Sequence, residues 1–204
     1  MKSICVVGMD GTGKSTLVKK LHQWLGEKES VIQYMGMKNW ETGLAKYYFT
    51  NLEEKKYFVV IGTCFSIVYE LYRRVLKYRN SKKTIIFDRY IDERIISLHK
   101  ARKPWKRFLL KCFFRFAFLF FHRPSIMIYL TCDARTSFDR KDDINSQEVK
   151  QSFLESKKDM DEFYLSKPGV FVFNTNDMKA DEVFEEVRHI VIKKLLAEKN
   201  IFSS

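Results

Sequence analysis

The segment from Gly8 to Ser15 reads Gly-Met-Asp-Gly-Thr-Gly-Lys-Ser, and it constrains the fold more than any other part of the chain. It follows an apolar run, residues 4–7, and precedes a helix-like stretch, residues 16–25. A buried strand, a glycine-rich turn and a helix N-terminus together aim backbone N–H groups at one point, where they can bind phosphate. The pattern therefore predicts a phosphate-binding loop. An ordinary glycine-rich corner is the alternative, and the Lys-Ser pair in register argues against it.

Each residue type in this loop suits a nucleoside triphosphate. Glycines let the backbone approach phosphate oxygens without a Cβ in the way. Lys14 can reach the β- and γ-phosphates, and the Ser15 hydroxyl can bind Mg²⁺. The predicted cofactors are therefore ATP and Mg²⁺. The residues predicted to bind them in this loop are Gly8, Asp10, Gly11, Thr12, Gly13, Lys14, Ser15 and Thr16.

Short apolar runs alternate with segments of helical periodicity along the chain. The predicted strands are residues 3–7, 30–34, 84–87, 126–130 and 170–173, and helical patterns cover 53–77, 104–124, 146–165 and 180–198. Such short apolar runs are typical of strands buried on both faces of a parallel sheet. We expect an α/β fold of three layers, with a five-stranded parallel sheet flanked by helices, as one domain over residues 1–204. In the helix at 53–77, the expected buried stripe is Tyr57, Ile61, Cys64, Val68, Tyr72 and Val75.

The charge of the chain is high and uneven. The net charge is +12, and no acidic residue occurs from Arg94 to Cys132. Such a local field could attract nucleotide, nucleic acid or an anionic membrane surface. The four cysteines form no C-x-x-C pair and no apolar stretch is long enough to span a membrane, so we expect reduced thiols in a cytoplasmic protein.

A second motif, Asp88-Arg89-Tyr90, directly follows the predicted strand at residues 84–87. Ligands of open α/β sheets bind at the carboxyl ends of the strands. Asp88 is predicted to hold or orient Mg²⁺, and Arg89 to pair with the phosphate of an acceptor. The alternative is that Asp88 caps the next helix while its two neighbours lie on the surface.

A third segment, residues 131–143, follows the predicted strand at 126–130. Asp133 is a candidate helix N-cap. Arg135 and Arg140 precede a polar stretch, residues 141–146, that resembles a mobile lid. With the arginines included, the expected lid covers approximately residues 135–148. Arginines on a lid bring positive charge to a transferring phosphoryl group and help to exclude water. The alternative is a solvated helix end.

On these residues, the chain resembles thymidylate kinases and related P-loop nucleoside monophosphate kinases over nearly its whole length. The resemblance rests on Gly8 to Ser15, on Asp88-Arg89-Tyr90 and on the lid approach ending at Arg140. It implies a P-loop kinase fold and transfer of phosphate from ATP to a nucleoside monophosphate, with dTMP first. It also implies that Asp10 contacts the acceptor's sugar hydroxyl and Arg89 its phosphate. The implied catalytic residues are Lys14, Asp10, Arg89, Arg140 and Arg135, with Arg140 also contacting ATP.

The departures from this family fall on the acceptor side. Phe65 matches the aromatic residue that stacks on thymine, but Tyr69 stands where the family has an arginine that reads the base, with Arg73 one turn further on. The loop after the second strand lacks the family's Arg-Glu-Pro-like motif and has Lys38 as its cation. Two alternatives therefore stay open: a non-nucleotide acceptor, or a non-catalytic ATP-binding switch with a membrane- or partner-binding face.

Residues 104–124 are both aromatic and basic. Lys103, Arg107, Lys111 and Arg115 recur every four residues, and most of the remaining helix surface is Phe, Leu and Ala. A homodimer face, as in thymidylate kinases, would bury this surface, and a peripheral membrane contact is the rival. Nucleic acid is not an expected partner, because cations and aromatic residues do not interleave here as on strands that bind it.

Overall fold

The computed structural model describes residues 2–36, 42–43, 57–97, 104–140 and 147–201. Five parallel strands form one sheet in the order β2-β3-β1-β4-β5. Their bounds are β1 Ser3–Gly8, β2 Ser30–Tyr34, β3 Thr84–Asp88, β4 Ile126–Thr131 and β5 Val170–Asn174. All five predicted strands are confirmed. β1 is buried throughout and β4 almost so, which is why both read as continuous apolar runs.

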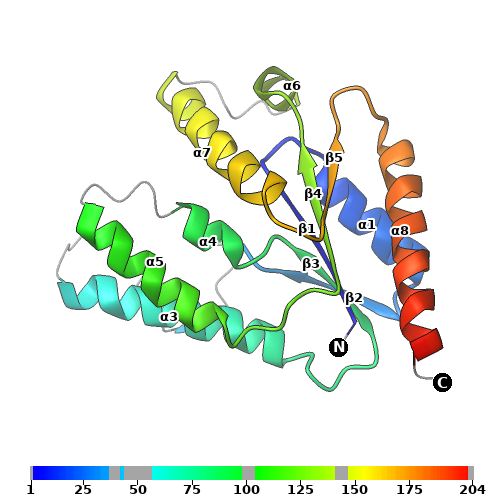
Figure 1. The fold of residues 1–204 in the computed structure, drawn as a ribbon, viewed down its shortest axis with the longest axis horizontal. Coiled ribbons are helices and arrows are strands. Elements are labelled where there is room, and N and C mark those ends of the chain that lie inside the picture. The colour runs from blue at the N-terminus through cyan, green and yellow to red at the C-terminus, as the bar shows by residue number, and fades with distance from the viewer. Residues whose placement is uncertain (1, 37–41, 44–56, 98–103, 141–146, 202–204) are drawn as a thin grey trace.

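Helices cover both faces of the sheet (Figure 1). One face carries α1 Lys14–Leu25 and α8 Ala180–Ile201, and the other carries α3 Tyr57–Leu76, α4 Asp92–Ser97, α5 Pro104–Phe118 and α7 Gln147–Leu165. The short helix α6, Ala134–Asp139, lies beyond the end of β4. The three-layer α/β prediction is confirmed.

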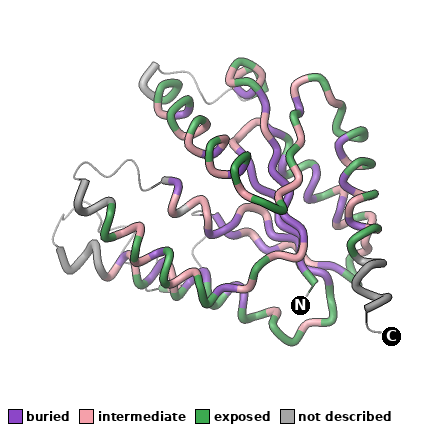
Figure 2. The backbone as a smooth tube through the Cα atoms, in the orientation of Figure 1, coloured by how far each residue is buried: buried purple, intermediate pink, exposed green. Residues whose placement is uncertain are grey.

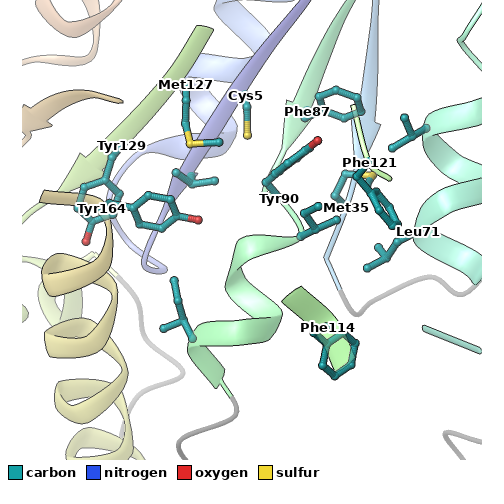
Figure 3. Packing of buried hydrophobic residues seen from close by; sticks show 14 of the residues in the cluster. Cys5, Met35, Leu71, Phe87, Tyr90, Phe114, Phe121, Met127, Tyr129 and Tyr164 are labelled. Atoms are coloured by element: carbon teal, nitrogen blue, oxygen red, sulfur yellow. The ribbon is translucent and has the colours of Figure 1, made fainter. Parts of the chain in front are cut away.

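A hydrophobic core lies on each face of the sheet, as the purple segments in Figure 2 show. The core beneath α3, α4, α5 and α7 is rich in aromatic residues, and Tyr129 and Tyr164 stack there with ring centroids 4.8 Å apart (Figure 3). The core beneath α1 and α8 is aliphatic and includes Leu17, Leu21 and Val187. These two cores fix the positions of the loops at the strand ends.

The strand order creates a switch point between β1 and β3. The connection from β1 to β2 crosses one face of the sheet, and the connection from β3 to β4 crosses the opposite face. β1 and β3 themselves pair directly, from Ser3↔Ile85 to Val6↔Asp88. The connections leaving these two neighbours therefore diverge and leave a crevice at their carboxyl ends. The loop after β1 is the predicted phosphate loop, and the loop after β3 begins with Arg89, so the fold brings the two motifs together.

The structure corrects three local expectations. The buried face of α3 is centred on Ile67, Leu71 and Arg74, whereas Tyr72 is exposed; the side chains of Tyr57 and Ile61 lie outside the described residues. Hydrophobic spacing was misleading there because a buried ion pair occupies part of the core face. α5 ends at Phe118 and does not continue to residue 124. Asp133 occupies the N-cap position of α6, but its side chain makes no capping hydrogen bond.

Candidate active site

The phosphate loop joins β1 to α1 and is shaped by left-handed backbone at Gly11 (φ +84°) and Gly13 (φ +88°). Gly13 is the N-cap of α1, and Lys14 is the first residue of that helix. The Thr12 hydroxyl donates to the Met9 carbonyl at 2.8 Å, and this hydrogen bond stabilises the turn. The N-terminus of α1 therefore lies at the switch point, where its free N–H groups suit a phosphate.

Lys14 is buried within this loop. Its Nζ donates to the Met9 carbonyl at 2.5 Å and lies 3.7 Å from Asp10 Oδ1. Burial, together with the nearby Arg89, lowers the pKa of Lys14 to about 8, although Asp10 acts in the opposite direction. The ammonium group thus carries an unfavourable desolvation energy that an anionic phosphate at this position would relieve.

Arg89 crosses from the end of β3 to the phosphate loop. Its guanidinium donates to Asp10 and, at 3.0 Å, to Glu93 Oε2. Burial lowers the pKa of Arg89, but Glu93 and Asp10 outweigh this effect and raise it overall, so the group is permanently charged. Among the described residues, Arg89 is the one non-glycine residue with positive φ, at +71°. Such a conformation costs roughly 1–2 kcal/mol and is concentrated at functional sites.

Asp88 and Ser15 are the side chains that could hold Mg²⁺. Asp88 is half-buried at the end of β3; burial raises its pKa, while Lys14 and Arg89 lower it. Ser15 is exposed in the first turn of α1. In the described part of the chain, no three His, Cys, Asp or Glu side chains gather into a metal cluster. One carboxylate and one hydroxyl suit Mg²⁺, which keeps water and substrate phosphates as its other ligands.

A cavity of about 530 Å³ opens beside the phosphate loop, between α1 and the start of α8. Thr12, Gly13, Thr16, Arg140 and residues 175–180 contribute to its lining. Arg140 donates to the Thr175 carbonyl at 2.8 Å and, more weakly, to the Gly11 carbonyl at 3.4 Å. It therefore links the phosphate loop to the end of β5. Arg135 lies exposed on α6 and does not line this cavity.

The residues of α3 that were predicted to bind the acceptor are more exposed than the residues of the phosphate loop. Phe65 is 60% exposed and Tyr69 is 54% exposed, and Arg73 is exposed too. The Phe65 ring packs edge-on against Phe113 of α5, with centroids 5.0 Å apart. Lys38 lies outside the described residues.

An ion pair that sequence reasoning missed anchors the chain leaving β2. Arg74 and Glu70 are buried and joined at 2.9–3.0 Å. Arg74 also donates to the carbonyls of Tyr34 (3.0 Å) and Gly36 (3.3 Å), while Glu70 accepts from the Thr42 N–H at 3.1 Å. These bonds hold Gly36 and Thr42 to α3, on either side of the residues predicted to include the acceptor-binding Lys38.

The missed residues did leave signals in the sequence. Glu70 and Arg74 are opposite charges four residues apart, a spacing that places them together on a helix. Glu93 is likewise four residues from Arg89, although Arg89 itself precedes α4. Thr175 follows β5 directly, so the rule that ligands bind at strand ends could have pointed to it.

Gly11 is the loop position where a side chain should be least tolerated. A Cβ there would lie 2.8 Å from the Ser137 carbonyl oxygen and 2.9 Å from Ser137 Cα, whereas a Cβ at Gly13 would meet nothing within 4 Å. Both glycines have positive φ, so both substitutions share that strain. We expect Gly11→Ala to lower the melting temperature clearly more than Gly13→Ala, because α6 must also shift. Equal losses, measured by thermal unfolding, would contradict this packing of α6 on the loop.

A parallel α/β sheet with a phosphate loop and an Asp-Arg pair at its switch point defines the P-loop phosphotransferase class. Residues 6–187 match the family model described as thymidylate kinase, and the chain belongs to that family. It is therefore a nucleotide kinase, and the predicted resemblance is confirmed. No curated protein sequence matches the chain.

Solved structures share the fold at low sequence identity. A thymidylate kinase from Candida albicans is 16% identical, with a TM-score of 0.70 over 94% of this chain and 91% of that one. A deoxyadenosine kinase from M. mycoides with bound dATP is 19% identical, with a TM-score of 0.68 over 93% of this chain and 98% of that one.

Proposed function

We propose that the protein transfers the γ-phosphoryl group of ATP to a nucleoside monophosphate, with dTMP as the first candidate. The observation that carries this proposal is the convergence of Asp10, Lys14 and Arg89 at the switch point. A protein that only bound ATP would need the phosphate loop. It would have little use for a charged arginine held in a strained backbone conformation beside that loop.

On the donor side, the triphosphate would lie along the N-terminus of α1. Lys14 would leave the Met9 carbonyl and bind the β- and γ-phosphates, where its charge offsets the charge that develops during transfer. Mg²⁺ bound near Ser15 and Asp88 would neutralise phosphate charge and help to orient the γ-phosphate. The cavity beside Arg140 would take the nucleoside part of ATP.

On the acceptor side, Arg89 would bind the phosphate of the monophosphate and Asp10 its sugar hydroxyl. In the structure, Arg89 is held by Asp10 and Glu93, so an incoming phosphate would compete with Asp10 while Glu93 keeps the guanidinium in place. Phe65 would stack on the base. The chain thus acts mainly by positioning the reactants and by neutralising charge.

A broader acceptor range is the second candidate, and Tyr69 favours it. This half-exposed residue stands where an arginine would read thymine, and loss of a base-reading hydrogen bond relaxes specificity by orders of magnitude. Structures of the same fold include a deoxyadenosine kinase, and the Candida albicans enzyme is reported to have broad substrate specificity. Deoxynucleosides therefore belong beside the monophosphates as acceptors to be tested.

The test is ADP formation from ATP and Mg²⁺ with dTMP, dUMP, dCMP, dAMP and dGMP, and with the matching nucleosides. We expect turnover with at least one monophosphate and a narrow spread of kcat/KM among the bases. Tyr69→Arg should raise the preference for dTMP, by about 10-fold or more if the arginine reaches the thymine edge. Turnover with nucleosides alone, or with none of these acceptors while ATP still binds, would overturn the monophosphate proposal.

A further inference from the structure

Thr175 follows β5 directly and lies where the ends of β4 and β5 meet the phosphate loop. It is 4% exposed, and its backbone N–H donates at 2.8 Å to the carbonyl of Thr131, the last residue of β4. Thr131 is paired in register with Asn174, so this bond belongs to the edge of the sheet. The backbone of Thr175 is therefore fixed by the sheet itself.

The Thr175 hydroxyl faces carbonyl oxygens from two different segments. Its Oγ1 lies 3.3 Å from the Thr12 carbonyl oxygen in the phosphate loop and 3.3 Å from the Thr131 carbonyl oxygen at the end of β4. A hydroxyl has one hydrogen to donate and two lone pairs that can accept. The hydroxyl can therefore donate to either carbonyl while it accepts from a third group.

Arg140 supplies that third group. Its Nη2 donates to the Thr175 carbonyl at 2.8 Å, and its Nη1 lies 3.4 Å from the Thr175 hydroxyl and 3.4 Å from the Gly11 carbonyl. Two of the three hydrogen bonds that the guanidinium makes within the described part of the chain thus go to Thr175. Arg140 is the exposed C-cap of α6, where a long side chain has many rotamers unless its head group is held.

Thr12, Arg140 and Thr175 all contribute to the lining of the cavity of about 530 Å³ beside the phosphate loop. This is the cavity in which the nucleoside part of ATP is proposed to bind. Thr175 is too deeply buried to offer much surface to a ligand, whereas Arg140 is exposed. The contribution of Thr175 to binding is therefore indirect, through the groups that it holds.

We propose that Thr175 is a positioning residue for the donor nucleotide, because it holds the Arg140 guanidinium in place beside the phosphate loop. This inference rests on the proposed function only in taking ATP as the ligand of the cavity. A guanidinium that is already held does not have to be ordered when the nucleotide binds, so less binding energy is lost. Removing the Thr175 hydroxyl should therefore weaken ATP binding and leave acceptor binding unchanged.

The test is titration calorimetry of ATP with Mg²⁺ and without an acceptor, followed by ADP formation with the preferred acceptor. Thr175→Val keeps the shape of the side chain and removes the hydroxyl. We expect it to raise Kd and KM for ATP about 5-fold, as the loss of a hydrogen bond does, with KM for the acceptor unchanged. Thr175→Ser keeps a hydroxyl and should restore ATP binding. Thr84→Val changes a buried threonine at the start of β3, far from the carboxyl ends of the strands, and is the matched control.

A double-mutant cycle shows whether Thr175 acts through Arg140. In an Arg140→Met background, Thr175→Val should change Kd for ATP by less than about 2-fold, because the group that the threonine holds is gone. An effect as large as in the wild-type background would overturn the proposal. So would an unchanged Kd in Thr175→Val, including one with a lowered melting temperature, or an equal change in Thr84→Val. The expected changes in Kd without turnover of any monophosphate would overturn the monophosphate proposal alone.

Discussion

Replacing Lys14 by methionine should lower kcat/KM for ADP formation by at least about 100-fold, or roughly 3 kcal/mol of transition-state stabilisation. The ammonium group lies inside the phosphate loop, next to the helix N-terminus at which the triphosphate is expected. A methionine fills much the same volume but cannot bind the phosphate oxygens. Steady-state kinetics with saturating Mg²⁺ and the preferred acceptor measure the effect.

The stability of this variant separates chemistry from folding. Burial lowers the pKa of Lys14 to about 8, so its charge is unfavourable in the folded chain at neutral pH. Lys14→Met should therefore leave the melting temperature unchanged or raise it. Lys19→Met, at an exposed position of the same helix, is the matched control and should retain wild-type kinetics. Comparable activity in the two variants would show that Lys14 does not take part in catalysis.

Replacing Arg74 by methionine should lower the free energy of unfolding by about 3–5 kcal/mol, because it leaves the Glu70 carboxylate buried without its main charge partner. The bonds from Arg74 to the carbonyls of Tyr34 and Gly36 are lost as well. We expect KM for the acceptor to rise, since the segment after β2 loses its anchor. Urea unfolding monitored by circular dichroism measures the stability term.

Neighbouring residues supply the controls for this prediction. Arg73→Met changes an exposed arginine beside Arg74 and should alter the unfolding free energy by no more than about 0.5 kcal/mol. Glu70→Leu/Arg74→Met removes both charges and should cost less than Arg74→Met alone, because no buried charge is left unpaired. A double variant less stable than the single one would argue against a penalty from the unpaired carboxylate.

Local chemistry made the conformation of the loop after β1 predictable. Gly11, Gly13 and Lys14 shape this loop through their backbone conformation and their spacing within one turn. Both the conformation and the spacing depend only on neighbouring residues, so they can be predicted from the sequence. The triplet beginning at Asp88 could be assigned to a strand end for a similar reason, and the structure makes Asp88 the last residue of β3. The strands themselves could be found because burial on both faces forces continuous apolar runs.

The polar contacts of α3 were harder to predict because their parts come from distant segments. Hydrophobic spacing placed Tyr72 in the core, whereas the structure buries Arg74 and Glu70 there and bonds them to the chain after β2. A polar pair is stable in a core only when other segments of the fold supply hydrogen-bonding partners for it. The hydrophobic periodicity of one helix does not reveal those partners.

By itself, the sequence determined that this chain builds a parallel α/β sheet and places a glycine-rich turn and a helix N-terminus after its first strand, because each of these depends on residues close together in the chain. Only the tertiary structure decided that Arg89 meets Asp10 and Glu93, that Arg140 joins the phosphate loop to the end of β5, and that Phe65 of α3 packs against Phe113 of α5. These contacts join segments separated by many residues, so they depend on strand order and helix packing, which are fixed only when the whole chain folds.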